Sequence, residues 1–155
     1  MIRNIDERVG YHIGVAAHII QNSYNQKLSE YDLTVAQAKV LYMLVNHGNQ
    51  LQSELQNRLY IKGSTMNGII ESMLKKKLID KEDSDIDRRS KLIILTEKGR
   101  ALEENLWLGT QDMDEELMKG FTEDEKQVLL VCLKRIKKNL IEHKEGNEYA
   151  TKISE

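Results

Sequence analysis

The chain has 155 residues, a net charge of −2 and no proline, where an average composition of about 5% proline would give roughly eight. This length fits one domain with an extension, and 31% charged residues without proline make a turn-rich β sandwich or barrel a poor candidate. Because proline in a helix interior costs about 3 kcal/mol, its absence favours long helices.

The cysteine count and the hydropathy exclude further classes of protein. A single cysteine, Cys132, rules out an intrachain disulfide framework and a cysteine-rich zinc site. The first eight residues lack the apolar stretch of a secretory signal, and the longest apolar runs are far shorter than the ~20 residues of a membrane span. We therefore expect a cytoplasmic protein that has no membrane contact.

Two helices are predicted in the first third of the chain. Apolar residues recur at steps of three and four from Ile5 to Leu28, which predicts a long amphipathic helix. Thr34 followed by Gln37 has the pattern of a capping box, so a second helix is expected to begin there and to end near Gly48.

A helix-turn-helix followed by a hairpin is predicted in the centre. Short helices over 51–59 and from about Ser64 to Lys76, joined by a few residues, have the helix-turn-helix pattern. Two short strand candidates follow, 78–83 and 91–95, and the polar loop 84–90 separates them. A helix-turn-helix followed by strand, charged loop and strand is the outline of a winged helix.

Two further helices are predicted in the C-terminal third. Thr96 can cap a helix that reaches about Met118, and Thr122 with Glu125 forms a second capping box that opens the last helix. The last helix carries an apolar stripe, and the polar stretch from Glu142 onward is expected to fray. The stripe consists of Val128, Leu129, Cys132, Leu133, Ile136 and Leu140.

The predicted fold is mainly α with a small β-hairpin wing, a winged helix-turn-helix core between long terminal helices. We expect an N-terminal dimerisation helix over 1–32, a DNA-binding domain over 33–99, C-terminal dimerisation helices over 100–145 and a polar tail over 146–155. The terminal helices carry more apolar stripe than so small a core can cover, so we expect them to bury it across a homodimer.

Residues 87–99, with the sequence DRRSKLIILTEKG, resemble the wing signature of the MarR family of bacterial transcriptional regulators. The signature is an aspartate, any residue, an arginine, five residues and Leu-Thr, and here it continues through Glu-Lys-Gly. Weaker matches flank it in the same order: Leu33-Thr34 with Gln37 and Val40-Leu41, Glu54-Leu55 before Leu59, Ser64-Thr65, and Leu74 to Ile79.

Three positions depart from the family pattern. Leu51 stands where the family commonly has a capping Ser or Thr, and Lys77 stands where it often has glycine. Gly68, which follows Asn67, stands where Arg or Lys is common. It costs the helix up to about 1 kcal/mol and removes a possible DNA contact. These departures concern the target sequence more than the fold.

The predicted DNA-binding surface has two parts. Residues 51–99 hold ten basic and eight acidic side chains, a local charge of +2 in an acidic protein. Recognition helices read bases with their N-terminal residues, so the candidates in the second helix of the motif are Lys62, Ser64, Thr65, Asn67 and Gly68. Capping of the helix is the alternative role of Ser64 and Thr65.

The wing supplies the second part of this surface. Arg88, Arg89 and Lys91 are the candidate contacts, since arginines at a loop tip suit the narrow minor groove. The resemblance makes Arg89 the arginine of the signature and implies that Asp87 braces the loop by pairing with it. A solvated charged hairpin is the alternative.

The resemblance implies a homodimeric regulator, most often a repressor, that reads a pseudo-palindromic operator in double-stranded DNA. It also implies a small aromatic or phenolic effector bound between the dimerisation and DNA-binding regions. Five side chains suit such a cleft, although core packing is the favoured role of each and no ligand site is assigned. They are Tyr24, Met43, Met73, Trp107 and Met113.

We expect no enzyme activity, no cofactor and no metal site. The four histidines form no metal-binding pattern with carboxylates, and neither a nucleophile elbow nor a glycine-rich phosphate loop is present. Two alternative functions stay open. One is a redox-sensing regulator switched through Cys132, although a buried structural role is favoured for this residue. The other is a winged-helix module that binds another protein.

Overall fold

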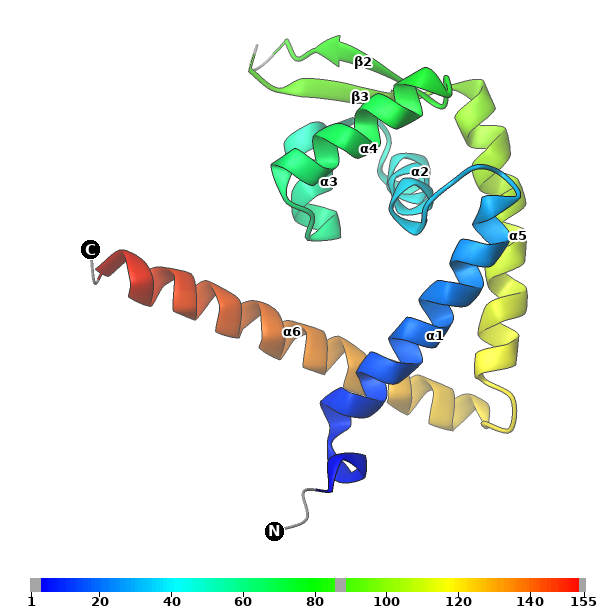
Figure 1. The fold of residues 1–155 in the computed structure, drawn as a ribbon, viewed down its shortest axis with the longest axis vertical. Coiled ribbons are helices and arrows are strands. Elements are labelled where there is room, and N and C mark those ends of the chain that lie inside the picture. The colour runs from blue at the N-terminus through cyan, green and yellow to red at the C-terminus, as the bar shows by residue number, and fades with distance from the viewer. Residues whose placement is uncertain (1–3, 86–88, 154–155) are drawn as a thin grey trace. The chain divides into compact units, whose positions relative to one another are not determined.

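The computed structural model describes residues 4–85 and 89–153, with side chains as far as residue 147, and it is mainly helical (Figure 1). Its contacts divide the chain into two compact units, Met1–Leu108 and Gly109–Glu155. Asp87 and Arg88 of the predicted wing lie outside the described residues. Among those described, no helix combines the length and the apolar content needed to cross a bilayer.

The first unit contains the predicted helices and strands in the predicted order, and helix α5 continues into the second unit. A short 3-10 helix, η1, precedes α1. The bounds are η1 Ile5–Glu7, α1 Val9–Ser29, α2 Val35–His47, β1 Gln50–Leu51, α3 Gln52–Leu59, α4 Gly63–Lys75, β2 Ile79–Asp83, β3 Lys91–Leu95 and α5 Glu97–Leu117. The predicted fold class, mainly α with a small hairpin wing, is confirmed.

The strands form one antiparallel sheet in the order β1-β3-β2. The hairpin pairs Ile79 with Leu95 and Asp83 with Lys91, as the two strand candidates suggest. The two-residue strand β1 was not expected; it pairs Gln50 with Ile93 on the other side of β3. This pairing joins the start of α3 to the hairpin.

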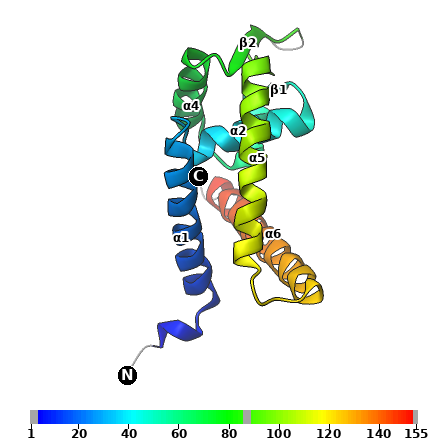
Figure 2. The same cartoon turned by 90° about the vertical axis from the view of Figure 1, so that its right-hand side faces the viewer.

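The hydrophobic core lies where the helix-turn-helix meets the strands. Figures 1 and 2 show α2, α3 and α4 gathered beside the strands, with α1 leading away from α2. Helices α2, α3 and α4 and strands β2 and β3 each contribute buried apolar side chains, so the recognition helix and the hairpin share one core. The core residues are Leu28, Leu33, Val40, Leu41, Leu44, Leu55, Met66, Ile70, Met73, Leu78, Ile79 and Ile93.

The predicted capping boxes are present. Thr34 Oγ1 accepts from the Gln37 backbone N–H at 3.2 Å, and Gln37 Oε1 accepts from the Thr34 N–H at 3.2 Å. Thr122 and Glu125 make the same reciprocal pair, with distances of 2.8 and 3.2 Å. Each box satisfies two backbone N–H groups at a helix start, which is why these positions could be predicted from local sequence.

The second unit holds the end of α5 and the last helix, α6 Glu123–Ile153. The expectation that the chain frays after Glu142 is wrong, because α6 continues through this polar stretch to Ile153. The sequence favours a buried position for Cys132, but in this single chain Cys132 is exposed on α6. Apolar residues of the stripe, among them Leu133 and Leu140, are exposed beside it.

Candidate DNA-binding surface

The turn between α3 and α4 sets the recognition helix against the core. Tyr60 takes a left-handed conformation, with φ of 54°, and Ile61 then donates its N–H to the carbonyl of Gln56 at 3.0 Å. Helix α3 starts without a hydroxyl cap, as the departure at Leu51 suggests, but Glu54 Oε2 accepts from the Leu51 N–H at 2.8 Å. This departure therefore leaves the start of the helix-turn-helix intact.

Helix α4 buries one face and exposes the other. Met66, Ile70 and Met73 are completely buried, at the spacing of four and three residues that a helix face requires. The candidate DNA-contact residues lie away from that face, on the N-terminal half of the helix. Lys62, Ser64, Thr65, Asn67 and Gly68 are all exposed.

Ser64 and Thr65 lie in the first turn of α4 and do not occupy its N-cap position. The helix begins at Gly63, and its N-cap, Lys62, makes no side-chain capping hydrogen bond. Ser64 and Thr65 therefore lie inside the first turn and not at the N-cap position where a hydroxyl would cap the helix. The N–H groups of this turn carry the positive end of the helix dipole, which favours a phosphate.

One side-chain contact on this surface was missing from the sequence analysis. Gln52 Nε2, at the start of α3, donates to Asn67 Oδ1 at 2.5 Å. The bond fixes the Asn67 carbonyl oxygen toward α3 and leaves its amide nitrogen as a donor. No local pattern predicts this contact, because the two residues are fifteen positions apart and meet only when α3 packs on α4.

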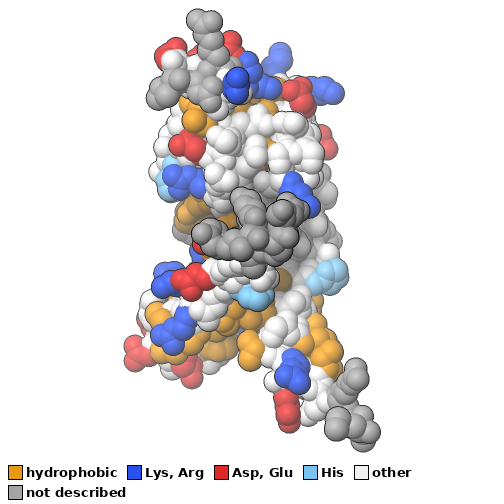
Figure 3. All heavy atoms as spheres, turned by 90° about the vertical axis from the view of Figure 1, so that its left-hand side faces the viewer, with side chains coloured by type: hydrophobic (Ala, Val, Ile, Leu, Met, Phe, Trp, Pro, Cys, Tyr) orange, Lys and Arg blue, Asp and Glu red, His pale blue; other side chains and the backbone are white. Residues whose placement is uncertain are grey.

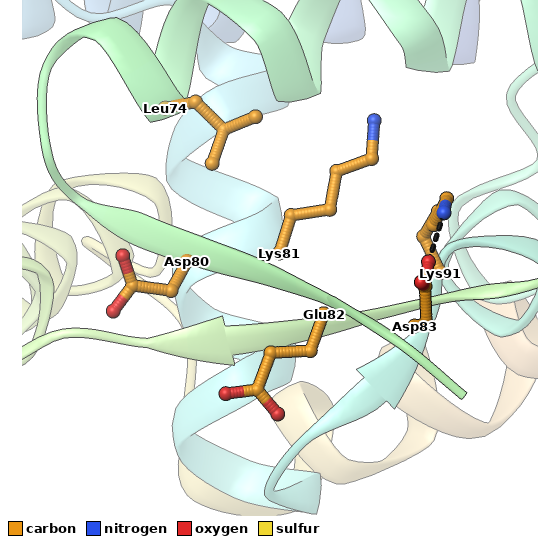
Figure 4. Close-up of a pocket in the computed structure, with 6 residues that line it drawn as sticks. All are labelled: Leu74, Asp80, Lys81, Glu82, Asp83 and Lys91. Carbon is orange, nitrogen blue, oxygen red and sulfur yellow. Dashed lines mark hydrogen bonds and ion pairs between the residues drawn. The ribbon is translucent and has the colours of Figure 1, made fainter. Parts of the chain in front are cut away.

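In the wing, Lys91 is paired within the hairpin. Its Nζ contacts Asp83 Oδ1, the residue opposite it in the strand register (Figure 4). The hydrogen bond and the charge of Lys91 lower the pKa of the exposed Asp83 carboxyl. Sequence reasoning could have found this pair by folding the hairpin about the loop 84–90. Lys91 must exchange or share this partner to contact a phosphate.

Strand β2 carries three carboxylates, Asp80, Glu82 and Asp83, and one cation, Lys81. Asp80 and Glu82 are exposed on it, and Lys81 Nζ lies 3.5 Å from Glu71 Oε1 of α4. A shallow hollow between this strand, Leu74 and Lys91 is lined mainly by charged side chains (Figure 4). In Figure 3, basic and acidic side chains are interspersed at the end of the view that holds the hairpin. Arg89, near the loop, is also exposed.

The end of the wing signature joins the hairpin to α5. Thr96 Oγ1 accepts from the Gly99 N–H at 3.0 Å and donates to the Lys77 carbonyl at 2.8 Å. A Cβ on Gly99 would lie 2.2 Å from the Leu78 carbonyl oxygen. The Thr and Gly of the signature thus let the first turn of α5 sit directly against the chain that leads into β2.

Four of the five side chains considered for an effector cleft separate into two groups. Met73 is buried in the core, with Tyr24 and Met43 packed against it, as the core role predicts. Trp107 instead is 44% exposed, and its ring stacks on Tyr42 with centroids 5.5 Å apart. Over the part of the chain that the structure describes, no three His, Cys, Asp or Glu side chains form a metal-binding group.

Known proteins are similar to this chain in sequence and in fold. Residues 31–90 match the sequence model of the MarR family. The HTH-type transcriptional regulator TcaR of Staphylococcus aureus is 36% identical over 115 residues, which are 70% of this chain and 76% of TcaR.

Two solved structures superpose closely on the chain. A mutant of MarR from Escherichia coli, complexed with operator DNA, has 28% identity and a TM-score of 0.76 and covers 83% of this chain and 92% of its own. BpsR of Bordetella bronchiseptica, whose DNA binding is regulated by 6-hydroxynicotinic acid, has 25% identity and a TM-score of 0.80. The match covers 88% of this chain and 98% of BpsR.

Proposed function

This chain belongs to the MarR family of DNA-binding transcriptional regulators, and we propose that it is a homodimeric, ligand-responsive repressor that works in the cytoplasm. The observation that carries the proposal is the exposed N-terminal half of α4, where Ser64, Thr65 and Asn67 face away from the core. Hydroxyl and amide side chains there can pair with base edges in the major groove.

The two-fold symmetry of a homodimer predicts the form of the operator. Each protomer places one α4 in the major groove, so the half-sites are related by a pseudo-two-fold axis and lie about 34–36 Å apart, or a multiple of this. Selection of bound duplexes from a random-sequence pool tests this. Enrichment of an inverted repeat supports the proposal. If no sequence is enriched, the alternative function, a winged-helix module that binds another protein, is favoured.

The wing is proposed to hold the flanking minor groove through Arg88, Arg89 and Lys91, with Asp87 bracing the loop. The double variant Arg88→Ala, Arg89→Ala should weaken operator binding and flatten its dependence on salt, because two phosphate-neutralising charges are removed. An unchanged affinity and an unchanged salt slope would show that the wing does not contact DNA. Asp83→Asn is the matched variant that releases Lys91, and it should strengthen binding.

An aromatic effector is proposed because BpsR, with the same fold, is regulated by 6-hydroxynicotinic acid. Trp107 is the only tryptophan, it is half exposed and it stacks on Tyr42, so its fluorescence reports on aromatic ligands that reach this part of α5. Titration with hydroxylated aromatic acids should change the Trp107 emission and release DNA over the same concentration range. DNA release without an emission change would place the effector elsewhere.

A redox switch is the second candidate, because Cys132 is exposed in the single chain and a thiol sensor must be accessible. Peroxide treatment of the parent protein and of Cys132→Ser decides between a redox role and a structural role of Cys132. If only the parent releases DNA, the thiol is the sensor. Equal DNA release, or none, in both proteins would remove Cys132 from the mechanism.

A further inference from the structure

The C-terminal end of α4 is tied by polar side chains to the corner between α1 and α2. Lys76 Nζ donates to the backbone carbonyl of Asp32 and lies 3.4 Å from the Asp32 carboxylate. It also donates to Gln37 Oε1 at 3.3 Å, and Gln37 Nε2 donates to Ser72 Oγ at 2.9 Å. Gln37 is buried and the Lys76 side chain is 25% exposed, so the Lys76–Gln37 and Gln37–Ser72 bonds are partly shielded from water, whereas the Asp32 carboxylate is exposed.

The same end of α4 is also held from the other side. Lys98 Nζ, in the first turn of α5, donates to the Lys76 carbonyl at 2.9 Å, and Thr96 Oγ1 donates to the Lys77 carbonyl. The residues that directly follow α4 therefore bond both to the chain before α2 and to the start of α5. All these contacts lie within the first compact unit.

The hydrogen bonds of Lys76 restrict the rotation of α4, which the apolar core alone does not fix. Burial of Met66, Ile70 and Met73 holds α4 against the core, but hydrophobic contact has no direction and tolerates small rotations of a helix. Hydrogen bonds are directional, and those of Lys76 define one rotation of α4. Asn67 lies nine residues from Lys76, about 13 Å along the axis, so a tilt at Lys76 is carried to the base-reading end.

We propose that Lys76 is a positioning residue for DNA recognition, which locks α4 to the corner between α1 and α2 in the orientation that reads the operator. This inference rests on the proposed function, in which α4 enters the major groove. Lys76 itself lies at the far end of α4 from the candidate base contacts. Its effect on DNA binding is therefore expected through helix orientation, in addition to the loss of one charge.

The test compares four variants with the parent on two duplexes, the operator selected from the random pool and a scrambled duplex of the same length and composition. Lys76→Met keeps the aliphatic stem and removes the donors, and Lys76→Arg keeps a cationic donor. Lys75→Met removes a charge from the exposed neighbouring side chain and controls for electrostatics. Ser72→Ala removes the Gln37 partner with a residue that favours helix.

Lys76→Met is expected to bind the operator about tenfold more weakly than Lys75→Met does, the loss that one or two hydrogen bonds represent. Binding to the scrambled duplex should be equal in these two variants, because non-specific binding depends on phosphates and not on helix rotation. Lys76→Arg should recover most of the discrimination. Ser72→Ala should also lower the preference for the operator over the scrambled duplex. If Lys76→Met is unfolded at the assay temperature, the result for Ser72→Ala tests the proposal in its place.

Two results overturn the inference. One is that Lys76→Met and Lys75→Met behave alike on both duplexes, and the other is an equal loss for Lys76→Met on operator and scrambled DNA. Failure of the proposed function looks different. In that case the parent protein itself does not distinguish the two duplexes, whichever residue occupies position 76.

Discussion

Gly99 lies at a position that has no room for a side chain. It is buried in the first turn of α5, and a Cβ there would lie 2.2 Å from the Leu78 carbonyl oxygen and 2.8 Å from Leu95 Cδ1. The nearer atom belongs to the backbone just before β2, so relief requires α5 to move away from the hairpin. The glycine at the end of the wing signature is therefore required for packing.

We expect Gly99→Ala to lower the free energy of unfolding by about 2 kcal/mol or more, as for other overpacked buried sites. Gly68→Ala is the control, since nothing lies within 4 Å of its Cβ position and it occupies a helix interior. That variant should gain about 0.5–1 kcal/mol. Urea titration of both proteins measures the difference, and equal stabilities would contradict the close approach of α5 to Leu78.

Glu103 is a buried carboxyl in α5, only 7% exposed. Burial raises its pKa above the ordinary value of 4.5, the neighbouring Glu104 raises it further, and Arg100 opposes both effects. A carboxyl whose pKa is raised by folding binds its proton more tightly in the folded state. The free energy of unfolding therefore falls as the pH rises from the ordinary pKa to the raised one, and the penalty then persists at neutral pH.

Glu103→Gln should remove this penalty, because the amide has the same shape and carries no charge. The variant should be more stable than the parent at pH 7, and the two should converge below about pH 4, where Glu103 is protonated in both the folded and the unfolded chain. Thermal unfolding across this pH range measures the difference. If the stability gain is the same at every pH, its cause is packing and not the charge of Glu103.

At the scale of elements, three helices end in the same way without glycine. Leu33, Ile61 and Leu78 each donate an N–H to a carbonyl five residues back, and the residue before each has φ between 52° and 59°. This is the Schellman arrangement, in which glycine usually takes the left-handed position. Here the left-handed residues are Asp32, Tyr60 and Lys77.

Glycine at these positions should stabilise the protein, since a left-handed conformation costs most side chains roughly 1–2 kcal/mol. Tyr60→Gly and Lys77→Gly should each gain about 0.5–1 kcal/mol after the larger chain entropy of glycine is counted. Asp32→Gly should gain less, because Asp tolerates this conformation and also pairs with Lys76. The alanine variants keep the strain, so a gain in Tyr60→Ala or Lys77→Ala would contradict this account.

The elements that could be predicted from the sequence are those with local causes. The boxes at Thr34 and Thr122 act over three residues, and the helices between them follow from apolar spacing. Strand β1 could not be predicted, because Gln50–Leu51 is a strand only through its pairing with β3. The exposed DNA-reading half of α4 follows from the buried spacing of its other face, whereas the Gln52–Asn67 and Lys76–Asp32 contacts depend on how separate helices meet.

At the scale of the whole molecule, a single chain leaves apolar surface uncovered in both units. In the first unit α1 exposes Val9 and Ile19, and in the second α6 exposes Leu133 and Leu140, the last with 65% of its surface accessible. Figure 3 shows hydrophobic side chains at the surface in the lower part of the view. Surface of this kind on terminal helices fits the homodimer proposed above.

The double variant Leu133→Glu, Leu140→Glu tests that proposal, because both side chains are exposed and need not be buried for the chain to fold. The parent is expected to sediment at twice its 18.0 kDa mass and the variant at the monomer mass. Operator affinity should fall by roughly 10²–10⁴-fold, since each half-site is then bound without its linked partner. Lys138→Glu is the control, because Lys138 lies two residues before Leu140 and hence on the opposite side of α6. It should remain dimeric, and a double variant that also remains dimeric would place the interface elsewhere.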